Sequence, residues 1–313
     1  MRKRLSSLTI RAILSALFIF LLIYKLDIEN LLLAFNSISI KSLILPSIFY
    51  LFTYLLISLR WLVLLRAFKP GISFRAALGY QLIGFFFSNF LPSGIGGDFV
   101  RAYLVSKRYG KADEITSTII MERLLGFAAT LIISLVLSPF SVMRKELRIF
   151  ILILNIIFTG IIIIALNLRP KKIFSFLPFV SVRDFLSSTI NSIYSFREKL
   201  RELFWGFFFS LLYQTALIYF YYIVGRALGV NISLVDYLTY LPLIWVISLL
   251  PVSINAIGVR EAGFSFFFRE LGQSPSLGFM NSIVGFFITL ILSLIGGVVF
   301  ILNKGGKIAS IEA

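Results

Sequence analysis

The sequence predicts an all-α polytopic membrane protein with six spanning helices and two re-entrant, broken-helix hairpins arranged as inverted repeats. Three observations lead to this fold class. Of the 313 residues, 59% are hydrophobic and 14% are charged, whereas about 25% are charged in soluble domains. Several uncharged stretches are long enough to cross a bilayer, and two shorter ones end at proline and glycine. The two halves of the chain also align with each other.

Composition excludes several kinds of site. The chain has no cysteine and no histidine, so disulfides, thiolate or imidazole metal sites and a histidine general base are excluded. We therefore expect no cofactor, no metal and no catalytic residue. The formal charge is +16, and in a membrane protein such an excess binds anionic lipid headgroups at the cytoplasmic face. We expect no nucleic-acid partner.

Spanning helices are expected where about 20 apolar residues can cover a hydrocarbon core ~30 Å thick. A shorter run, 12–24, follows the basic start of the chain and has no small-residue cleavage site after it. We interpret this run as a retained anchor helix rather than a signal peptide. With it, the chain has six predicted spans, the other five being 42–59, 124–143, 149–168, 203–225 and 271–303.

Two further apolar runs, 76–91 and 237–250, would cover only about 24 and 21 Å as helices. They end at Pro92 and Pro251, and glycines follow each proline. Each run could cross with a loop beyond it or turn back. If both cross, 12 loop lysines and arginines lie inside and 15 outside. If both turn back, 19 lie inside and 8 outside, as the positive-inside rule requires. We therefore expect re-entrant hairpins in the cell membrane, with cytoplasmic termini.

The halves align when the sequence is shifted by 159 positions. Pro92 then falls on Pro251 and Arg101 on Arg260, and eight of the 15 residues in 121–135 are identical to their counterparts. Because apolar composition matches proline, arginine and glycine in one frame only rarely, we interpret this as a duplication. The single transmembrane domain, 1–313, then divides into repeat 1, a connecting helix with a cytoplasmic amphipathic loop, and repeat 2, over 43–138, 139–202 and 203–302.

The breaks carry the candidate binding site. A helix that restarts after Gly97 exposes free N–H groups and a positive dipole end, and Arg101 follows one turn later. The second repeat has Arg260 in the equivalent place, and arginine binds a phosphodiester through two parallel hydrogen bonds. The candidate substrate-binding residues are Asn89, Ser93, Gly94, Gly96, Gly97, Asp98, Arg101, Glu122, Arg123, Asn255, Gly258, Arg260 and Glu261.

Structural roles compete with this interpretation. Asp98 is equally suited to capping the helix that it begins, or to pairing with Arg101. Glu122 and Arg123 are also compatible with a simple interfacial ion pair. Arg60 lies near the end of a predicted span, where snorkelling to the interface accounts for it. The basic, phenylalanine-containing stretch 169–202 is typical of an amphipathic surface helix and loop.

The motif Asn89-Phe-Leu-Pro-Ser-Gly-Ile-Gly-Gly-Asp98, with Arg101 and Glu122-Arg123, resembles the flippase-like membrane region of lysylphosphatidylglycerol synthases. Residues 251–272, with Gly258-Val-Arg-Glu261, resemble the same family. Members fused to an aminoacyl-transferase domain make and translocate aminoacylated phosphatidylglycerol. This chain ends at Ala313 without that domain, so the resemblance implies the translocating half only. The second break departs from the pattern in having fewer glycines.

These expectations converge on a flippase-like transporter that moves a phosphate-bearing lipid, a phospholipid or a polyprenyl-phosphate-linked one, across the cytoplasmic membrane. Its expected partners are the lipid substrate and anionic headgroups, with a lipid synthase as a further candidate. Two alternatives stay open. One is an integral-membrane enzyme acting on lipid-linked substrates, with Asp98, Glu122 or Glu261 as acid or base. The other is a non-transporting partner subunit of a lipid synthase.

Overall fold

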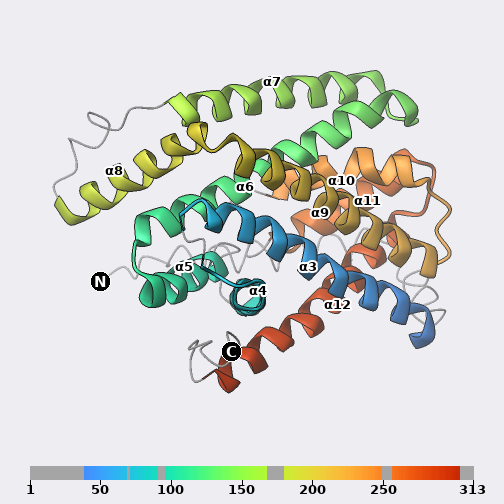
Figure 1. The fold of residues 1–313 in the computed structure, drawn as a ribbon. Coiled ribbons are helices and arrows are strands. Elements are labelled where there is room, and N and C mark those ends of the chain that lie inside the picture. The colour runs from blue at the N-terminus through green and yellow to red at the C-terminus, as the bar shows by residue number, and fades with distance from the viewer. Residues whose placement is uncertain (1–38, 69–70, 91–95, 168–179, 249–255, 304–313) are drawn as a thin grey trace, which may run out of the picture.

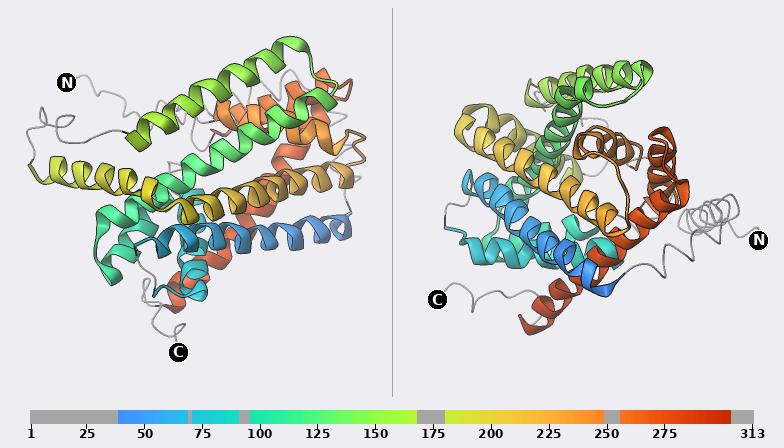
Figure 2. Two further views of the ribbon diagram at one scale, coloured as in Figure 1. Left: turned by 45° about the horizontal axis from the view of Figure 1, so that its top comes forward. Right: turned by 90° about the vertical axis from the view of Figure 1, so that its right-hand side faces the viewer.

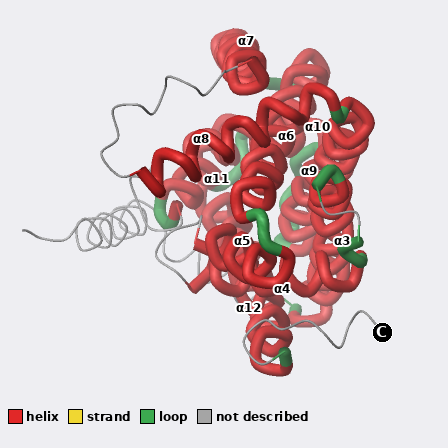
Figure 3. The backbone as a smooth tube through the Cα atoms, turned by 60° about the vertical axis from the view of Figure 1, so that its left-hand side comes forward, coloured by secondary structure: helices red, strands yellow, loops and turns green. Residues whose placement is uncertain are grey.

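The computed structural model describes residues 39–68, 71–90, 96–167, 180–248 and 256–303. Within these ranges the chain forms ten α-helices, three short 3-10 turns and no strand, and short loops join the helices (Figure 3). The helices are α3 (Ile44–Arg66), α4 (Phe74–Phe90), α5 (Gly96–Tyr109), α6 (Ala112–Leu137), α7 (Lys145–Asn167), α8 (Val180–Ser195), α9 (Leu200–Ala227), α10 (Leu234–Ser248), α11 (Val259–Glu270) and α12 (Pro275–Leu302).

Five segments are long and apolar enough to cross a membrane. They coincide with five of the six predicted spans, because length and hydropathy alone define this class of helix. The predicted anchor helix, 12–24, lies outside the described residues. The five segments are Lys41–Arg66, Ala112–Phe140, Lys145–Ile164, Leu200–Ala227 and Pro275–Leu302.

The predicted breaks separate two pairs of short helices. α4 ends at Phe90 and α5 begins at Gly96, while α10 ends at Ser248 and α11 begins at Val259. Both breaking prolines lie outside the described residues. The start of α11 is visible: Gly258 has φ 87°, and its N–H donates to the Glu261 carboxylate across 2.6 Å. Glycine suits this position because it adopts a positive φ without strain.

The long helices α3 and α9 pack side by side and run in opposite directions (Figure 1). Their side-chain contacts show the antiparallel register directly. The Phe49 ring lies 5.0 Å from that of Tyr219 at one end of the pair, and Leu64 packs on Gly206 at the other. The first helices of the two aligned halves are therefore antiparallel neighbours.

The short helices α4 and α10 each contact both halves of the chain. α4 packs on α12 as well as on α5, and α10 packs on α6 as well as on α11. In Figure 1, α4 is seen nearly end-on, whereas α3 and α9 run across the view. The contact between α4 and α12 is close, because a Cβ at Gly296 would overlap the Leu82 carbonyl group. Small residues of this kind let membrane helices approach each other.

The segment between the aligned halves contains α7 and α8. α7 packs on α6 and α8 and lies at the edge of the bundle, with α6 between it and α3 (Figure 2). α8 packs along the first part of α6. Ser188 of α8 donates a hydrogen bond to Asp113 of α6, which fixes α8 at that end. α8 thereby becomes a wall of the site described next.

Candidate functional site

The first turn of α5 is held against α4 by glycine. A Cβ at Gly97 would overlap both the Gly84 carbonyl oxygen and the Ser88 hydroxyl group. Only glycine permits this approach, so Gly97 fixes where α5 starts. The charged side chains Asp98 and Arg101 project from the same turns and meet α6.

A buried ion network lies where α3, α5 and α6 meet. Arg101 Nη2 donates to Glu122 Oε2 across 2.7 Å, and Arg60 Nη2 donates to Glu122 Oε1 across 2.8 Å. The exposed fractions are 2% for Arg101, 2% for Glu122 and 5% for Arg60. A buried charge of this kind is tolerated when it is paired and hydrogen-bonded, and Glu122 pairs with both arginines.

Asp98 extends the network toward the surface. One of its carboxylate oxygens accepts a hydrogen bond from Arg101 Nη2 across 3.1 Å, and the other accepts from Arg123. Asp98 thus pairs with Arg101, one of the structural roles that the sequence left open for it. Gln81 of α4 accepts from the other terminal nitrogen of Arg101. We call Arg60, Asp98, Arg101, Glu122 and Arg123 the arginine–carboxylate cluster.

Aromatic rings and a glycine support the cluster. The Arg101 guanidinium lies over the Trp61 ring, 4.2 Å from its centroid, in cation–π geometry. Trp61 Nε1 in turn donates to Thr118 Oγ1 across 3.1 Å, which holds the ring in place. Arg60 has room beside α6 because Gly126 lacks a side chain: a Cβ there would lie 3.0 Å from Arg60 Nη1.

The second half has a smaller charged group. Glu261 Oε1 accepts hydrogen bonds from Arg260 Nη2 across 2.6 Å and from Ser282 across 3.0 Å. The Arg260 guanidinium also lies 4.6 Å from the centroid of the Phe286 ring. Arg260 is thus occupied by a carboxylate and an aromatic ring, as Arg101 is.

The two halves differ in charge at the aligned position of Glu122. Its counterpart is Asn281, whose amide donates to the Tyr221 carbonyl oxygen across 3.1 Å and accepts from Tyr237 across 3.2 Å. These neutral hydrogen bonds replace the two ion pairs of Glu122. The counterpart of Arg123 is Ser282, so the first half alone carries the extended charged cluster.

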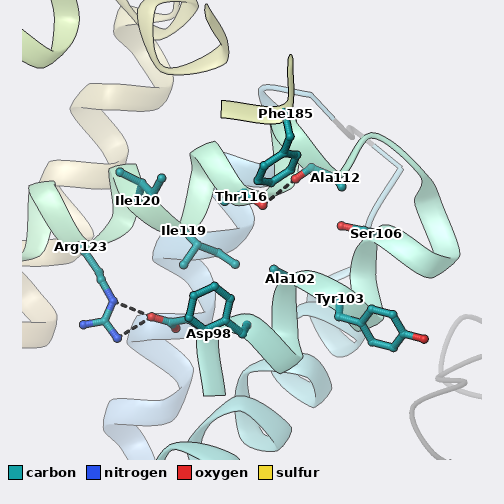
Figure 4. A pocket seen from close by; sticks show the side chains of 11 residues that line it. Asp98, Ala102, Tyr103, Ser106, Ala112, Thr116, Ile119, Ile120, Arg123 and Phe185 are labelled. Carbon is teal, nitrogen blue, oxygen red and sulfur yellow. Dashed lines mark hydrogen bonds and ion pairs between the residues drawn. The ribbon is translucent and has the colours of Figure 1, made fainter. Parts of the chain in front are cut away.

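A pocket of about 410 Å³ opens beside the cluster, among α5, α6 and α8 (Figure 4). Phe99, Ile119, Ile120 and Phe185 contribute apolar walls, and the paired Asp98 and Arg123 lie at one end. This volume is within the usual range for small-ligand sites. The pocket belongs to the first half and α8.

The structure brings together four of the predicted site residues: Asp98, Arg101, Glu122 and Arg123. Gly96 and Gly97 begin the same helix, and Asn89 lies near the end of α4. Gly258, Arg260 and Glu261 form a separate group at the start of α11. The remaining predicted residues, Ser93, Gly94 and Asn255, lie outside the described residues.

Sequence reasoning missed the role of Arg60. The prediction that the Arg60 side chain snorkels to the membrane interface is wrong, because Arg60 is buried and donates two hydrogen bonds to Glu122. The sequence did carry one signal for this role, the charge of Arg60 within an apolar helix. Charged residues in membrane helices generally face the bundle interior and pair with other charged or polar groups. Trp61 and Gln81 carried no comparable signal. The simple Glu122–Arg123 pair is replaced by separate partners: Glu122 binds Arg60 and Arg101, and Arg123 binds Asp98.

Comparison with known proteins supplies the family. Residues 8–297 match the lysylphosphatidylglycerol synthase TM region. No curated protein and no solved structure gives a significant match to the chain. The family match spans all ten described helices up to Gly297 and includes the arginine–carboxylate cluster. The chain therefore belongs to the lysylphosphatidylglycerol synthase TM-region family.

Proposed function

We propose that the protein translocates a phosphate-bearing lipid, either a phospholipid or a polyprenyl-phosphate-linked lipid, across the cytoplasmic membrane. The observation that carries the proposal is the antiparallel packing of α3 on α9, combined with the contacts that α4 and α10 each make with both halves. Inverted repeats with broken helices are the architecture of many secondary transporters. The family match concerns a membrane region, which supports a lipid-related membrane function.

The short helices support re-entrant hairpins. α4 has 17 residues and α11 has 12, which correspond to about 25 and 18 Å, both less than the ~30 Å core. A pair of such helices enters the membrane and returns to the same face. With this arrangement both termini are cytoplasmic, and the helix starts of α5 and α11 lie at equivalent depths in opposite copies.

Arginines at the two breaks are the proposed phosphate ligands. Arg101 and Arg260 occupy aligned positions, and both are bound to carboxylates, Glu122 and Glu261. A phosphodiester oxygen offers arginine the same charged acceptor as a carboxylate. In the proposed cycle the headgroup phosphate replaces these carboxylates on the guanidinium groups, while the remaining predicted residues of both breaks line its path.

Lipid scrambling by the purified protein in vesicles tests the proposal. We expect Arg101→Ala and Arg260→Ala to reduce the rate at least about tenfold, since a hydrogen bond to a charged group is worth roughly 1.5–3 kcal/mol. Arg226→Ala is the matched control, because Arg226 is exposed and binds only the loop at 230–231 among the described residues. Unchanged scrambling in both site variants would refute the phosphate role. Turnover of a lipid phosphate would instead favour a membrane enzyme.

A further inference from the structure

We propose that the pocket among α5, α6 and α8 is a binding slot for one acyl chain of an anionic phosphodiester lipid, with the phosphate at Arg123. The inference rests on the proposed function and adds to it a second position of the lipid, in which the phosphate has left Arg101 for Arg123 and one chain lies in the pocket. We call this pocket the acyl slot.

The walls of the acyl slot come from two stripes at helical spacing. On α6 the lining residues follow one face, from Ala112 through Thr116 and Ile119 to Arg123. On α5 the lining runs the other way, from Ser106 back to Asp98. The turn at Gly110 and Lys111, where both residues have positive φ, makes the two helices antiparallel. The two helices therefore line an elongated slot whose walls are mostly apolar and whose one end carries the charged Asp98 and Arg123.

The dimensions of the acyl slot suit a single chain. From Ala112 to Arg123 the helix rises about 16 Å at 1.5 Å per residue. One acyl chain covers half of a hydrocarbon core that is ~30 Å thick, or roughly 15 Å. Phe185 of α8 lies at the end of the slot beside Ala112 and Thr116 (Figure 4), so an aromatic ring flanks the position of the chain terminus.

The charge at the other end selects the headgroup. The arginine–carboxylate cluster contains three arginines and two carboxylates, which leaves one positive charge in excess. Within the described residues, Arg60 Nη1 and Arg101 Nε are buried and have no hydrogen-bond partner. One phosphodiester carries one negative charge, so its binding at Arg123, in exchange for Asp98, would make the cluster neutral. Arg123 is the most exposed arginine of the cluster, with 42% of its side chain exposed.

The polarity of the slot has mechanistic meaning. In the proposed topology α6 begins at the cytoplasmic face, so Arg123 lies deeper in the membrane than Ala112. A lipid with its phosphate at Arg123 and its chain end at Phe185 points opposite to a lipid resting in the cytoplasmic leaflet. Because Arg123 lies about 16 Å from the start of α6, near the middle of the ~30 Å core, the acyl slot holds an inverted lipid whose phosphate has not yet reached the outer face. Apolar walls stabilise the chain and Arg123 stabilises the phosphate.

Photocrosslinking with two phosphatidylglycerol probes tests this placement in the reconstituted full-length protein. One probe carries a diazirine at the end of an acyl chain, and the other carries it beside the glycerol ester. We expect the first to label peptides around Thr116 and Phe185, and the second to label those around Phe99 and Ile119. Reversed labelling, or labelling by neither probe within the slot, would overturn the proposal.

Two variants on one helix control for folding. Ile120→Trp fills the slot, whereas Ile132→Trp places the same bulk elsewhere on α6; the wild-type residues are 36% and 39% exposed. We expect about tenfold less labelling in Ile120→Trp and in Arg123→Gln, and wild-type labelling in Ile132→Trp. Equal labelling in the two tryptophan variants would refute the slot. Excess phosphatidylglycerol should abolish labelling and equimolar inorganic phosphate should not; displacement by phosphate would show an anion site without a chain.

Scrambling measured on the same vesicles separates this inference from the proposed function. If Ile120→Trp loses labelling but scrambles normally, the slot binds a chain off the transport path; the assignment of an inverted lipid in transit then fails, while the binding slot and translocation both stand. If wild-type protein is labelled as expected yet does not scramble lipid, translocation fails while the acyl slot stands.

Discussion

Arg101 and Glu122, on different helices, form a hydrogen-bonded ion pair of 2.7 Å in which each side chain is 2% exposed. Glu122 also binds Arg60, so one carboxylate of α6 joins α3 to α5. Because both arginines depend on it, this carboxylate is the central element of the buried network.

Glu122→Gln should therefore destabilise the protein strongly. The substitution keeps the shape but leaves the buried Arg60 without a carboxylate partner and Arg101 with Asp98 alone, and breaking a buried pair costs roughly 3–5 kcal/mol. Thermal unfolding in detergent, followed by tryptophan fluorescence, measures the effect. The control is Glu114→Gln, which removes a 2.8 Å pair with the exposed Lys111 and should cost below about 1 kcal/mol. Equal losses in both variants would contradict the central role of Glu122.

Two glycines of the broken-helix contacts should not tolerate a methyl group. Gly97→Ala and Gly296→Ala each place a Cβ against a carbonyl group of α4, and overpacking costs typically 1–3 kcal/mol. Gly160→Ala on α7 is the control, since nothing lies within 4 Å of its Cβ position. It should be neutral or stabilising by up to about 1 kcal/mol, because alanine favours helix. The same unfolding measurement ranks the three variants by their loss of stability. A loss in Gly97→Ala as small as that of the control would show that α4 and α5 are not packed as closely as described.

The antiparallel packing of α3 on α9 can be tested with paired cysteines in a chain that has none of its own. Phe49→Cys with Tyr219→Cys, and Leu64→Cys with Gly206→Cys, should be joined by a short bifunctional reagent. The mismatched pair at 49 and 206 should not react, because fifteen residues of helix separate the two contacts by about 22 Å. Reaction of the mismatched pair alone would mean that the helices are parallel.

The proposed topology makes Lys107 and Arg269 face opposite sides of the membrane. Single cysteines at these exposed positions should react with a membrane-impermeant maleimide from opposite compartments, in intact cells and in inverted vesicles. Lys107 lies in the last turn of α5 and Arg269 in the last turn of α11, so the labels report the orientation of both proposed hairpins. Finding both cysteines accessible from one side would exclude inverted hairpins.

The fold was predictable to the extent that it depends on length, hydropathy and helix breakers. Helices α3, α6, α7, α9 and α12 cover five of the six predicted spans, and α4 and α10, which precede the predicted breaks, are described as far as Phe90 and Ser248. These properties are local in the chain. A helix of the wrong length or a proline in its interior is visible without knowing any tertiary contact.

Pairing inside the site was only partly predictable. The repeat identified Arg101 and Arg260, and the break in symmetry drew attention to Glu122 and Arg123, but no pattern linked Arg60 to Glu122 across 62 residues. The acyl slot was not foreseen, since Phe185 of α8 reaches it through tertiary packing. Side-chain partners on different helices depend on rotation and register, which hydropathy does not encode.

Helix α7 has a consequence for the origin of the architecture. Each aligned half contributes an even number of long helices, α3 with α6 and α9 with α12. Even parity returns the chain to its starting side, so tandem copies joined by a short linker would point the same way. In the proposed topology, the single traverse of α7 makes the count odd and reverses the second copy, so that α9 runs opposite to α3. Deleting α7 would make the number of crossings between the starts of α3 and α9 even. In the proposed topology these two helices would then cross the membrane in the same direction and could not form the antiparallel pair.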